Sequence, residues 1–334
     1  MDNPAVPEIL LETRGLKKYF STPKGPLHAV DDVNITIAKG ETLGLVGESG
    51  CGKSTLGRVV IRLLEATGGS VFFGDQDIVK FDKNALRSFR KRAQMVFQDP
   101  YSSLNPRLSV EQLIAEPLRI HKIYPNERAT AVRVKELMDT VGLAQRLSTS
   151  FPHELDGGRR QRIGVARALA LNPEFIALDE PVSALDVCIQ AQILNLLMDL
   201  KDEFQYTYLF ITHDLSVVRH ISNRIAVMYL GKVIELANHL EIFDNPQHPY
   251  TQALLSAIPI PRLDIVRKAR IILEGDVPSP VNPPAGCRFY GRCPSRQDDC
   301  LEETPELKEI SPGHFLACYH PGPIATKTCN QSLE

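Results

Sequence analysis

The sequence predicts an α/β fold built around a parallel sheet, and three observations support this prediction. Residues 42–46 form an apolar run that leads into a glycine-rich turn and a helix-forming stretch over residues 53–65. Further apolar runs at residues 93–97, 175–180 and 208–212 end at polar side chains. Strands that are buried on both faces of a parallel sheet have such continuous apolar sequences. Residues 101–155 instead have helical periodicity and no strand pattern, which indicates an insertion.

The composition restricts the class of protein. A length of 334 residues is enough for about two domains. The net charge of −2 and a charged fraction of 23% argue against a nucleic-acid binder held by a basic face. The first residues lack a basic segment, and no stretch approaches the roughly 18 apolar residues of a membrane span. We therefore expect a chain that is neither secreted nor membrane-spanning.

Two segments before the glycine-rich turn alternate apolar and polar residues. They cover residues 9–16 and 28–37, and the pattern predicts half-buried antiparallel strands. Tyr19 lies between them and could stack on a nucleotide base, although taken alone it would be better explained by ordinary strand packing.

The glycine-rich turn has the spacing of a phosphate-binding loop. It comprises Gly47, Glu48, Ser49, Gly50, Cys51, Gly52, Lys53, Ser54 and Thr55. Its glycines let backbone N–H groups converge on an anion, and the following helix adds its dipole. In such a loop the lysine reaches the β- and γ-phosphates and the next hydroxyl binds Mg²⁺. An accidental glycine-rich turn is the alternative, and the strand before the loop and the helix after it argue against it.

The segment that follows predicts a helical insertion at about residues 101–165. Helical periodicity covers residues 110–120 and 127–141. Gln98, which follows the run at 93–97, is expected at the ligand edge of the sheet. The insertion closes with Leu155, Asp156, Gly157, Gly158 and Arg159, followed by a helix-forming run at 164–171. Two glycines at a helix start predict a second anion site.

The next apolar run ends in two carboxylates, Asp179 and Glu180. At a strand end, Asp179 could hold the Mg²⁺ shell and Glu180 could orient or deprotonate a water molecule. A helix cap in a solvated turn is the alternative, and the phosphate loop makes it the weaker one. The run at 208–212 brings His213 to the same edge. Further on, Asp186 is expected to cap a helix that covers the sheet. Residues 223–236 are expected to form a closing pair of strands.

Seven cysteines are unevenly distributed along the chain. Cys51 and Cys188 are isolated, whereas Cys287, Cys293, Cys300, Cys318 and Cys329 lie in the last fifty residues. In an intracellular protein that hydrolyses nucleoside triphosphates this clustering favours metal or cluster ligation over disulfides. The first four of the clustered cysteines have the spacing C-x5-C-x6-C-x17-C, which lacks the paired knuckles of most structural zinc sites. A four-iron cluster, a zinc ion and unligated core thiols all remain open.

Together these motifs resemble the ATP-binding subunits of ABC transporters. The matching features are Tyr19, the loop 47–55, Gln98, the signature 155–159, the acidic strand 175–180, the turn 183–186 and His213. The resemblance implies an ABC-type ATPase domain over residues 8–245, with a RecA-like core, an antiparallel β part and the helical subdomain. The segments 248–255 and 275–280 resemble the C-terminal extension of oligopeptide and dipeptide importer ATPases. That extension covers residues 246–334 and contains the clustered cysteines.

The resemblance also implies roles for individual residues. Tyr19 would stack on adenine, the loop with Lys53 and Ser54 would hold phosphate and Mg²⁺, and Asp179 would support the metal. Glu180 would act as general base, His213 would contact the γ-phosphate, and Gln98 would sense the metal. Asp156, Gly157 and Gly158 would face the nucleotide of a partner domain. Cys287, Cys293, Cys300 and Cys318 would bind a [4Fe–4S] cluster, as in some importer ATPases of this kind.

The implied assembly contains a second ATPase subunit, which is often a different chain, two transmembrane permease subunits and an extracytoplasmic peptide-binding protein. This chain would lie on the cytoplasmic face of the cell membrane. A soluble ABC-class ATPase acting on nucleic acid or ribosomes is the alternative. One phosphate loop, no sustained heptads and no net positive charge argue against it. The cargo is left open among dipeptides, longer peptides, nickel complexes and glutathione-like compounds.

One position departs from the family pattern. Where the signature reads Leu-Ser-Gly-Gly-Gln in the family, this chain has Asp156 in place of serine and Arg159 in place of glutamine. An ionised carboxylate accepts hydrogen bonds but donates none. Two hypotheses follow: Asp156 only caps the helix, or it weakens the ATP site formed with the partner's phosphate loop.

Overall fold

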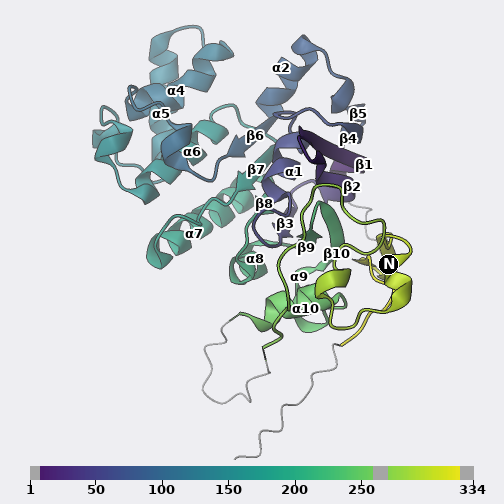
Figure 1. Ribbon diagram of the computed structural model, residues 1–334. Coiled ribbons are helices and arrows are strands. Elements are labelled where there is room, and N and C mark those ends of the chain that lie inside the picture. Colours follow the sequence, from purple (N-terminus) through teal and green to yellow (C-terminus); the bar gives the residue numbers. More distant parts are fainter. Residues whose placement is uncertain (1–7, 259–269, 324–334) are drawn as a thin grey trace, which may run out of the picture.

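The computed structural model describes residues 8–258 and 270–323, and two sheets organise it (Figure 1). The larger sheet has the strand order β11-β12-β10-β9-β3-β8-β7-β6. The smaller one has the order β2-β1-β4-β5. The strands of the larger sheet are β3 (Thr42–Val46), β6 (Ala93–Val96), β7 (Phe175–Asp179), β8 (Thr207–Ile211), β9 (Arg224–Tyr229), β10 (Lys232–Asn238), β11 (Lys308–Ser311) and β12 (His314–Leu316). Those of the smaller are β1 (Ile9–Thr22), β2 (Gly25–Ala38), β4 (Gly68–Phe73) and β5 (Gln76–Asp77).

The centre of the larger sheet is parallel and buried on both faces. β3 pairs in parallel with β8 and β9, and β7 pairs in parallel with β6 and β8. Successive residues of β7 enter different cores, because Phe175 and Ala177 face one core and Ile176 and Leu178 the other. This double burial explains the continuous apolar runs in the sequence. The parallel pairing brings the carboxyl ends of five neighbouring strands, in the order β9, β3, β8, β7 and β6, to one edge.

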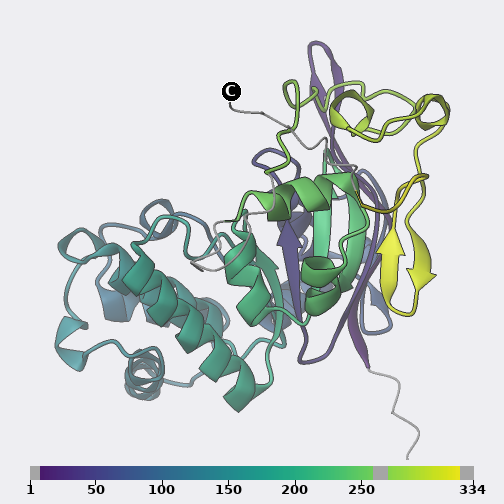
Figure 2. The ribbon, with the colours of Figure 1, turned by 90° about the horizontal axis from the view of Figure 1, so that it is seen from below.

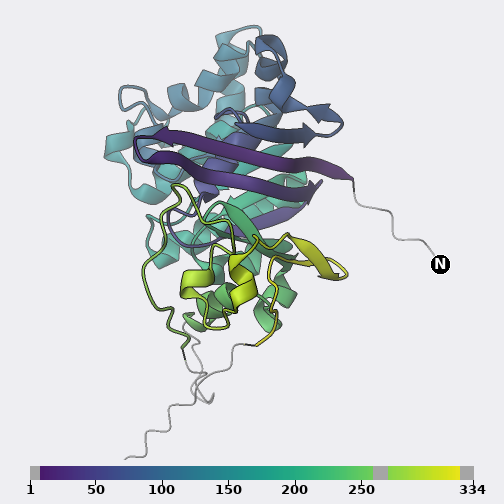
Figure 3. The same cartoon turned by 45° about the vertical axis from the view of Figure 1, so that its right-hand side comes forward.

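Helix α1 (Lys53–Val60) contacts both sheets. Its buried Leu56, Val59 and Val60 share a core with Leu43 and Leu45 of β3 and with apolar residues of the β1–β2 hairpin. Figure 3 shows this long hairpin crossing the molecule in front of the larger sheet. The phosphate loop at the start of α1 is therefore anchored between two sheets.

The helical insertion lies to one side of the sheets (Figures 1 and 2). Its helices are α3 (Pro100–Ser103), α4 (Val110–Ile120), α5 (Glu127–Thr140) and α6 (Gly157–Leu169), with short 3₁₀ turns at Gln145–Leu147 and Pro152–Glu154. Polar side chains cap the starts of these helices: Ser109 forms a capping box with Gln112, and Asn126 accepts a bond from Ala129 N–H. Three other helices cover the sheets: α2 (Lys83–Arg92), α7 (Val187–Phe204) and α8 (Leu215–Ile221). Residues Ile78–Lys80 form a further 3₁₀ turn.

The C-terminal extension packs on the catalytic sheet and extends it. It begins after α9 (His239–Asp244) and includes α10 (Pro249–Ser256) and 3₁₀ turns at Tyr290–Arg292 and Asp298–Leu301. β12 pairs with β10 through Glu235 and Leu316, so the β11–β12 hairpin forms the sheet's edge. Val281 also bridges to Leu27 of β2. The predicted domain boundary at residue 245 stays a prediction. Within the described residues, no helix combines the length and apolar character needed to cross a bilayer.

Several predicted boundaries were wrong. The helix after the phosphate loop ends at Val60 instead of residue 65, because Arg62 takes a left-handed conformation (φ 55°) and its guanidinium binds the carbonyls of Ile78 and Val79. The residues around Tyr19 belong to β1 instead of separating two strands. The last helix of the insertion begins at Gly157, before the predicted run at 164–171, and extends beyond residue 165. The strand predicted at 208–212 spans Thr207–Ile211, and the β11–β12 hairpin was not predicted.

Candidate nucleotide site and cysteine pocket

The phosphate loop needs its glycines for conformation and for space. Gly47, Gly50 and Gly52 all have positive φ angles, at 152°, 80° and 108°. A Cβ atom at Gly52 would lie 1.9 Å from the carbonyl oxygen of Ala29, and one at Gly47 would lie 2.2 Å from that of Met228. The loop therefore packs directly against β2 and β9 backbone, and larger residues would displace it.

The end of the loop is arranged to receive an anion. Helix α1 starts at Lys53 with Gly52 as its N-cap, so no side chain caps the first N–H groups. Lys53 is buried, and its Nζ donates to the carbonyl oxygens of Gly47 at 2.7 Å and Glu48 at 2.9 Å. The lysine thus lies inside the loop. Ser49 and Gly50 are exposed at its rim, whereas Cys51 is buried and Thr55 half-buried.

Ser54 and Asp179 meet at the edge of the sheet. Ser54 Oγ donates to Asp179 Oδ1 at 2.7 Å. The second oxygen, Oδ2, is buried and has no hydrogen-bond partner in the described part of the chain, and a guanidinium nitrogen of Arg58 lies 3.6 Å away. Burial raises the pKa of Asp179 above its usual value, while Ser54 and Arg58 lower it. A buried carboxylate oxygen beside a serine hydroxyl is suited to bind Mg²⁺ or its water ligands.

Three strand ends supply polar groups to one cluster. Gln98, after β6, donates from Nε2 to Glu180 Oε2 at 2.7 Å. His213, after β8, places Nδ1 3.1 Å from Glu180 Oε1. Glu180, after β7, is a non-glycine residue with a left-handed backbone (φ 46°), a conformation that is often found at functional sites. Both oxygens of this carboxylate are held by side chains from the neighbouring strands.

Tyr19 is tied to the strand beside it. Its hydroxyl donates to Asp31 Oδ1, and its ring stacks on that of His28 with 3.9 Å between centroids. Asp31 also receives a bond from Arg288. Burial raises the pKa of Asp31, but the hydrogen bonds from Tyr19 and His28, together with the charge of Arg288, outweigh this effect and lower the pKa to about 2. One face of the Tyr19 ring is therefore occupied by His28. Its stacking on adenine stays a prediction.

The signature segment starts helix α6. Asp156 caps the helix, because its Oδ1 accepts a 2.8 Å bond from the N–H of Arg159. Its Oδ2 lies 3.4 Å from the Arg159 guanidinium. Gly158 is buried where α6 passes α7, and a Cβ atom there would lie 2.6 Å from Ile189. A Cβ atom at Gly157 would lie 2.9 Å from Leu185.

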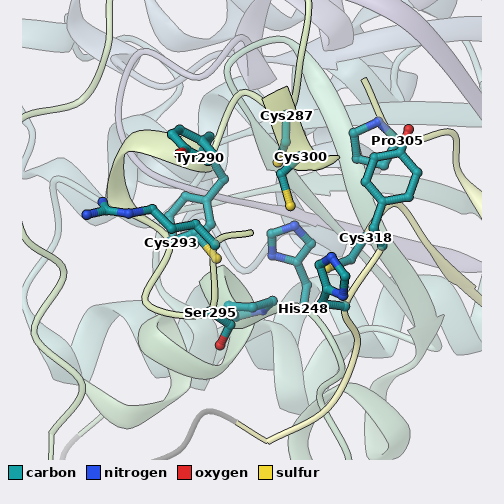
Figure 4. Close-up of a pocket in the computed structure, with 13 residues that line it drawn as sticks. His248, Cys287, Tyr290, Cys293, Ser295, Cys300, Pro305 and Cys318 are labelled. Carbon is teal, nitrogen blue, oxygen red and sulfur yellow. The ribbon is translucent and has the colours of Figure 1, made fainter. Parts of the chain in front are cut away.

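The four described cysteines of the C-terminal extension line one pocket (Figure 4). Cys287, Cys293, Cys300 and Cys318 share it with His248, the residue that caps α10. All cysteines in the described ranges are free thiols, and Cys329 lies outside them. Burial lowers the pKa of His248 to about 4, so its imidazole is neutral at physiological pH. Nearby, Asp299, Cys300 and His320 place one ligand atom each within 4.8 Å of one another.

The environment of the pocket favours the protonated thiol at Cys293 and Cys318. Burial raises the pKa of Cys293 to about 11 and that of Cys318 to about 12, and the neighbouring cysteines add to both increases. Backbone hydrogen bonds from Ser295 and His320 act in the opposite direction on these two thiols. Thiols of this kind lose their protons when a cation supplies the compensating charge.

Sequence reasoning missed four residues that contact this machinery. Arg58 approaches Asp179 from α1, and Tyr250, Arg288 and Arg292 reach the nucleotide site from the C-terminal extension. The local sequence of α1 gives no signal that Arg58 lies close to Asp179. The two arginines flank Phe289 between Cys287 and Cys293, and this spacing was the one available hint.

Comparison with known proteins agrees with this geometry. A family model described as ABC transporter matches residues 30–183, and one described as oligopeptide/dipeptide transporter, C-terminal region, matches residues 234–300. The oligopeptide transport ATP-binding protein AppF of Bacillus subtilis is 54% identical over 321 residues, which covers 93% of this chain and 97% of that protein. OppF of the same organism is 51% identical and covers 93% and 96%.

Solved structures resemble the catalytic part. The ATP-binding cassette MJ0796, in a dimeric post-hydrolysis state bound to ADP and Pi, has a TM-score of 0.63 and 29% identity, covering 69% of this chain and 98% of that one. CbiO1 of Clostridium perfringens has a TM-score of 0.63 and 27% identity, covering 71% and 92%. The chain belongs to the family of ABC transporter ATP-binding proteins that carry the oligopeptide/dipeptide transporter C-terminal region.

Proposed function

We propose that this chain hydrolyses ATP to power the import of peptides through a membrane transporter. The observation that best supports the proposal is that Gln98 and His213 contact the two oxygens of the Glu180 carboxylate. This cluster lies next to the Ser54–Asp179 pair and the phosphate loop. The names of its relatives, which are oligopeptide transport ATP-binding proteins, support peptides as the cargo. Di- and oligopeptides are both compatible with this proposal.

The residues divide the chemistry among them. Lys53 and the N–H groups at the start of α1 bind the phosphates, and Tyr19 packs against the base. Ser54 and Asp179 would hold Mg²⁺, with Gln98 near it, and the bound ion would offset negative charge on the phosphate oxygens. Glu180 accepts a proton from the attacking water. Gln98 and His213 hold the Glu180 carboxylate in position, and His213 contacts the γ-phosphate when nucleotide is present.

The active unit needs a second ATPase domain. We assign residues 8–245 to the catalytic domain and 246–334 to the C-terminal extension. Asp156, Gly157 and Gly158 face the nucleotide bound by the partner's phosphate loop, and the partner's signature completes the site of this chain. The partner is a different ATPase chain, and the pair drives two permease subunits fed by an extracytoplasmic peptide-binding protein. This places the chain at the cytoplasmic face of the membrane.

The cysteine pocket holds a metal centre in this proposal. Cys287, Cys293, Cys300 and Cys318 are the ligands of a [4Fe–4S] cluster, which tolerates their irregular spacing. The convergence of these cysteines on one pocket and the backbone hydrogen bonds to their sulfurs support this assignment. The centre cross-links an extension that has little apolar core of its own. A zinc ion is the alternative, supported by the grouping of Asp299, Cys300 and His320.

Purification of the tagged chain from its own cells tests the function. We expect a second ATPase and two permeases to co-purify in detergent. In liposomes, the complex should hydrolyse ATP faster when a peptide-loaded binding protein is added. Co-purification with ribosomes or nucleic acid and without permeases would contradict the proposal and favour the soluble ATPase class.

A further inference from the structure

The C-terminal extension contacts the phosphate loop through an ion pair. Arg292 donates from Nη1 to Glu48 Oε2 at 2.8 Å and from Nη2 to Oε1 at 3.1 Å. The pairing is bidentate, which fixes both the distance and the orientation of the carboxylate. The Arg292 side chain is 9% exposed and that of Glu48 27% exposed, so the pair is largely shielded from water. Its two partners are 244 residues apart in sequence.

A second contact holds the backbone of the same loop residue. The N–H of Glu48 donates to Tyr250 Oη at 2.9 Å. Tyr250 is fully buried and packs edge-on against Tyr229 and Phe289, with ring centroids 4.8 and 5.4 Å apart. Phe289 lies between Arg288 and Arg292, so one short segment carries the aromatic anchor and two cations. Glu48 is thus held at its side chain and at its backbone by the C-terminal extension.

The position of Glu48 bears directly on the catalytic lysine. Lys53 Nζ donates to the carbonyl oxygens of both Gly47 and Glu48. Any shift of the Glu48 peptide would therefore shift the lysine that binds phosphate. Glu48 also carries a negative charge within a loop that must accept a polyanion, and Arg292 provides the compensating cation.

Arg288 connects the C-terminal extension to the other end of the site, near Tyr19. Its guanidinium donates to Asp31 Oδ2 and to the carbonyl oxygen of Leu230. Asp31 accepts the hydroxyl hydrogen of Tyr19 on its other oxygen. The segment 287–293 thus contacts both the loop expected to bind phosphate and the residue that holds the tyrosine expected to stack on adenine.

We propose that Arg292 is a positioning residue for nucleotide binding, which neutralises Glu48 and fixes the phosphate loop, so that the C-terminal extension sets the affinity for Mg·ATP. This inference rests on the proposed function, since it takes loop 47–55 as the ATP site. The extension is then part of the nucleotide site, although it supplies no group that touches the reacting atoms.

The test measures, by titration calorimetry, how tightly the purified full chain and its variants bind Mg·AMP-PNP. Arg292→Gln should weaken binding at least tenfold, because it leaves Glu48 unpaired beside the phosphates. The double variant Glu48→Gln/Arg292→Gln should return to within about threefold of the wild type, since the uncompensated charge is gone. Arg296→Gln is the matched control: it removes the same charge from an exposed arginine of the same segment that bonds to Gly291 O, and binding should not change.

Kinetics of the assembled transporter separate positioning from catalysis. Arg292→Gln should raise KM for ATP and leave kcat within about twofold, because Glu180 is untouched. A general structural defect would instead persist in the double variant, so the rescue distinguishes the two causes. Unchanged affinity in Arg292→Gln, or no recovery in the double variant, would overturn the inference.

Two further outcomes complete the test. If Arg292→Gln does not fold, Glu48→Gln alone decides, because charge compensation predicts equal or tighter binding in that variant, and a tenfold loss would overturn the inference. If the wild type and Arg296→Gln also fail to bind the nucleotide, the proposed ATP site is itself wrong and the inference falls with it. If these two chains bind the nucleotide and Arg292→Gln does not, the result supports both the proposed ATP site and the inference about Arg292.

Discussion

Ser54 Oγ donates a 2.7 Å hydrogen bond to Asp179 Oδ1 across 125 residues of sequence. The bond fixes one oxygen of the carboxylate and leaves the buried Oδ2 without a hydrogen-bond partner among the described residues. Two expected Mg²⁺ contacts, one from the first turn of α1 and one from the end of β7, are thus joined before any nucleotide binds. The arrangement is costly for the folded protein without metal, because burial raises the pKa of Asp179.

The first prediction concerns this cost. A raised carboxyl pKa means that the folded state holds its proton at a higher pH than the unfolded state, so the charge destabilises the fold above the ordinary pKa of about 3.9. Asp179→Asn should therefore raise the Tm of the nucleotide-free chain at pH 7. The same variant should bind Mg·ATP roughly 10- to 100-fold more weakly, as is typical when groups that orient a metal are lost. Thermal shift with and without Mg·ATP measures both, and a lower Tm without nucleotide would contradict the first part.

The second prediction concerns the general base. Glu180→Gln should keep ATP affinity and lose about 10²- to 10⁴-fold in turnover at the site containing this phosphate loop. Glutamine can still accept a bond from Gln98, so the cluster should keep its shape. Site-resolved hydrolysis in the assembled complex is the measurement. Unchanged hydrolysis at this site would show that Glu180 is not the base.

The third prediction concerns the cysteine pocket. Anaerobic purification should give about four iron and four sulfide per chain, as expected for one [4Fe–4S] cluster. Serine at Cys293 should abolish the iron signal, whereas Cys188→Ser, at an exposed cysteine outside the pocket, should leave it unchanged. Stoichiometric zinc without iron would exclude the cluster and favour a zinc site.

The fourth prediction concerns the attachment of β12 to the catalytic sheet. His314 Nε2 lies 2.9 Å from Glu235 Oε1, and Nδ1 lies 3.7 Å from Glu241 Oε1. The bond to Glu235 raises the pKa of His314. The stabilising contribution is therefore complete below the unfolded pKa of about 6.5 and is lost as pH rises through the higher folded pKa.

Replacement of this histidine should accordingly have a pH-dependent effect. His314→Gln should lower the free energy of unfolding in urea more at pH 5.5 than at pH 8.5. His239→Gln is the control, since His239 contacts only the carbonyl oxygen of Asn223 among its hydrogen-bond partners in the described chain. An equal loss at both pH values would mean that His314 contributes through packing alone.

The parts of the site that could be predicted from the sequence are those that short local segments specify. The phosphate loop, Asp179, Glu180 and His213 each lie at the end of a buried strand or within two residues of it, so strand order alone brings them together. The continuation of β1 through Tyr19 was missed because irregularities in its register between Leu16 and Tyr19 interrupt the alternating pattern. Every residue of β11 is exposed, so that strand has no hydrophobic signal.

The contacts made by the C-terminal extension could not be predicted in the same way. The Arg292–Glu48 and Arg288–Asp31 pairs join residues 244 and 257 positions apart, and the local sequence around the arginines, which lie beside Phe289 between two cysteines, does not identify either partner. Their placement follows from the packing of Phe289 against Tyr229 and Tyr250, which is tertiary. Sequence patterns report local periodicity, whereas these pairs depend on how the extension docks.

The last prediction concerns Asp156 in the signature. In the structure it caps α6 through the N–H of Arg159 at 2.8 Å and lies 3.4 Å from the Arg159 guanidinium. The cap accounts for one oxygen of the carboxylate, and the charge remains. At about 4 Å and an effective dielectric near 20, two unit charges repel by roughly 4 kcal/mol, and the partner-bound triphosphate carries several charges. Arg159 and the dipole of α6 offset part of this repulsion.

We therefore expect the two composite ATP sites of the transporter to differ. Asp156→Ser keeps a good N-cap and restores a hydroxyl donor, so it should raise ATP occupancy or turnover at the partner's phosphate loop and leave the site of this chain nearly unchanged. Asp156→Asn, which keeps the cap without the charge, should give part of the gain if repulsion is the cause. Asp156→Ala should instead lose the cap, at about 1 kcal/mol of stability. Equal hydrolysis at both sites of the unmodified complex would rule out the asymmetry, and Asp156 would then be a helix cap and nothing more.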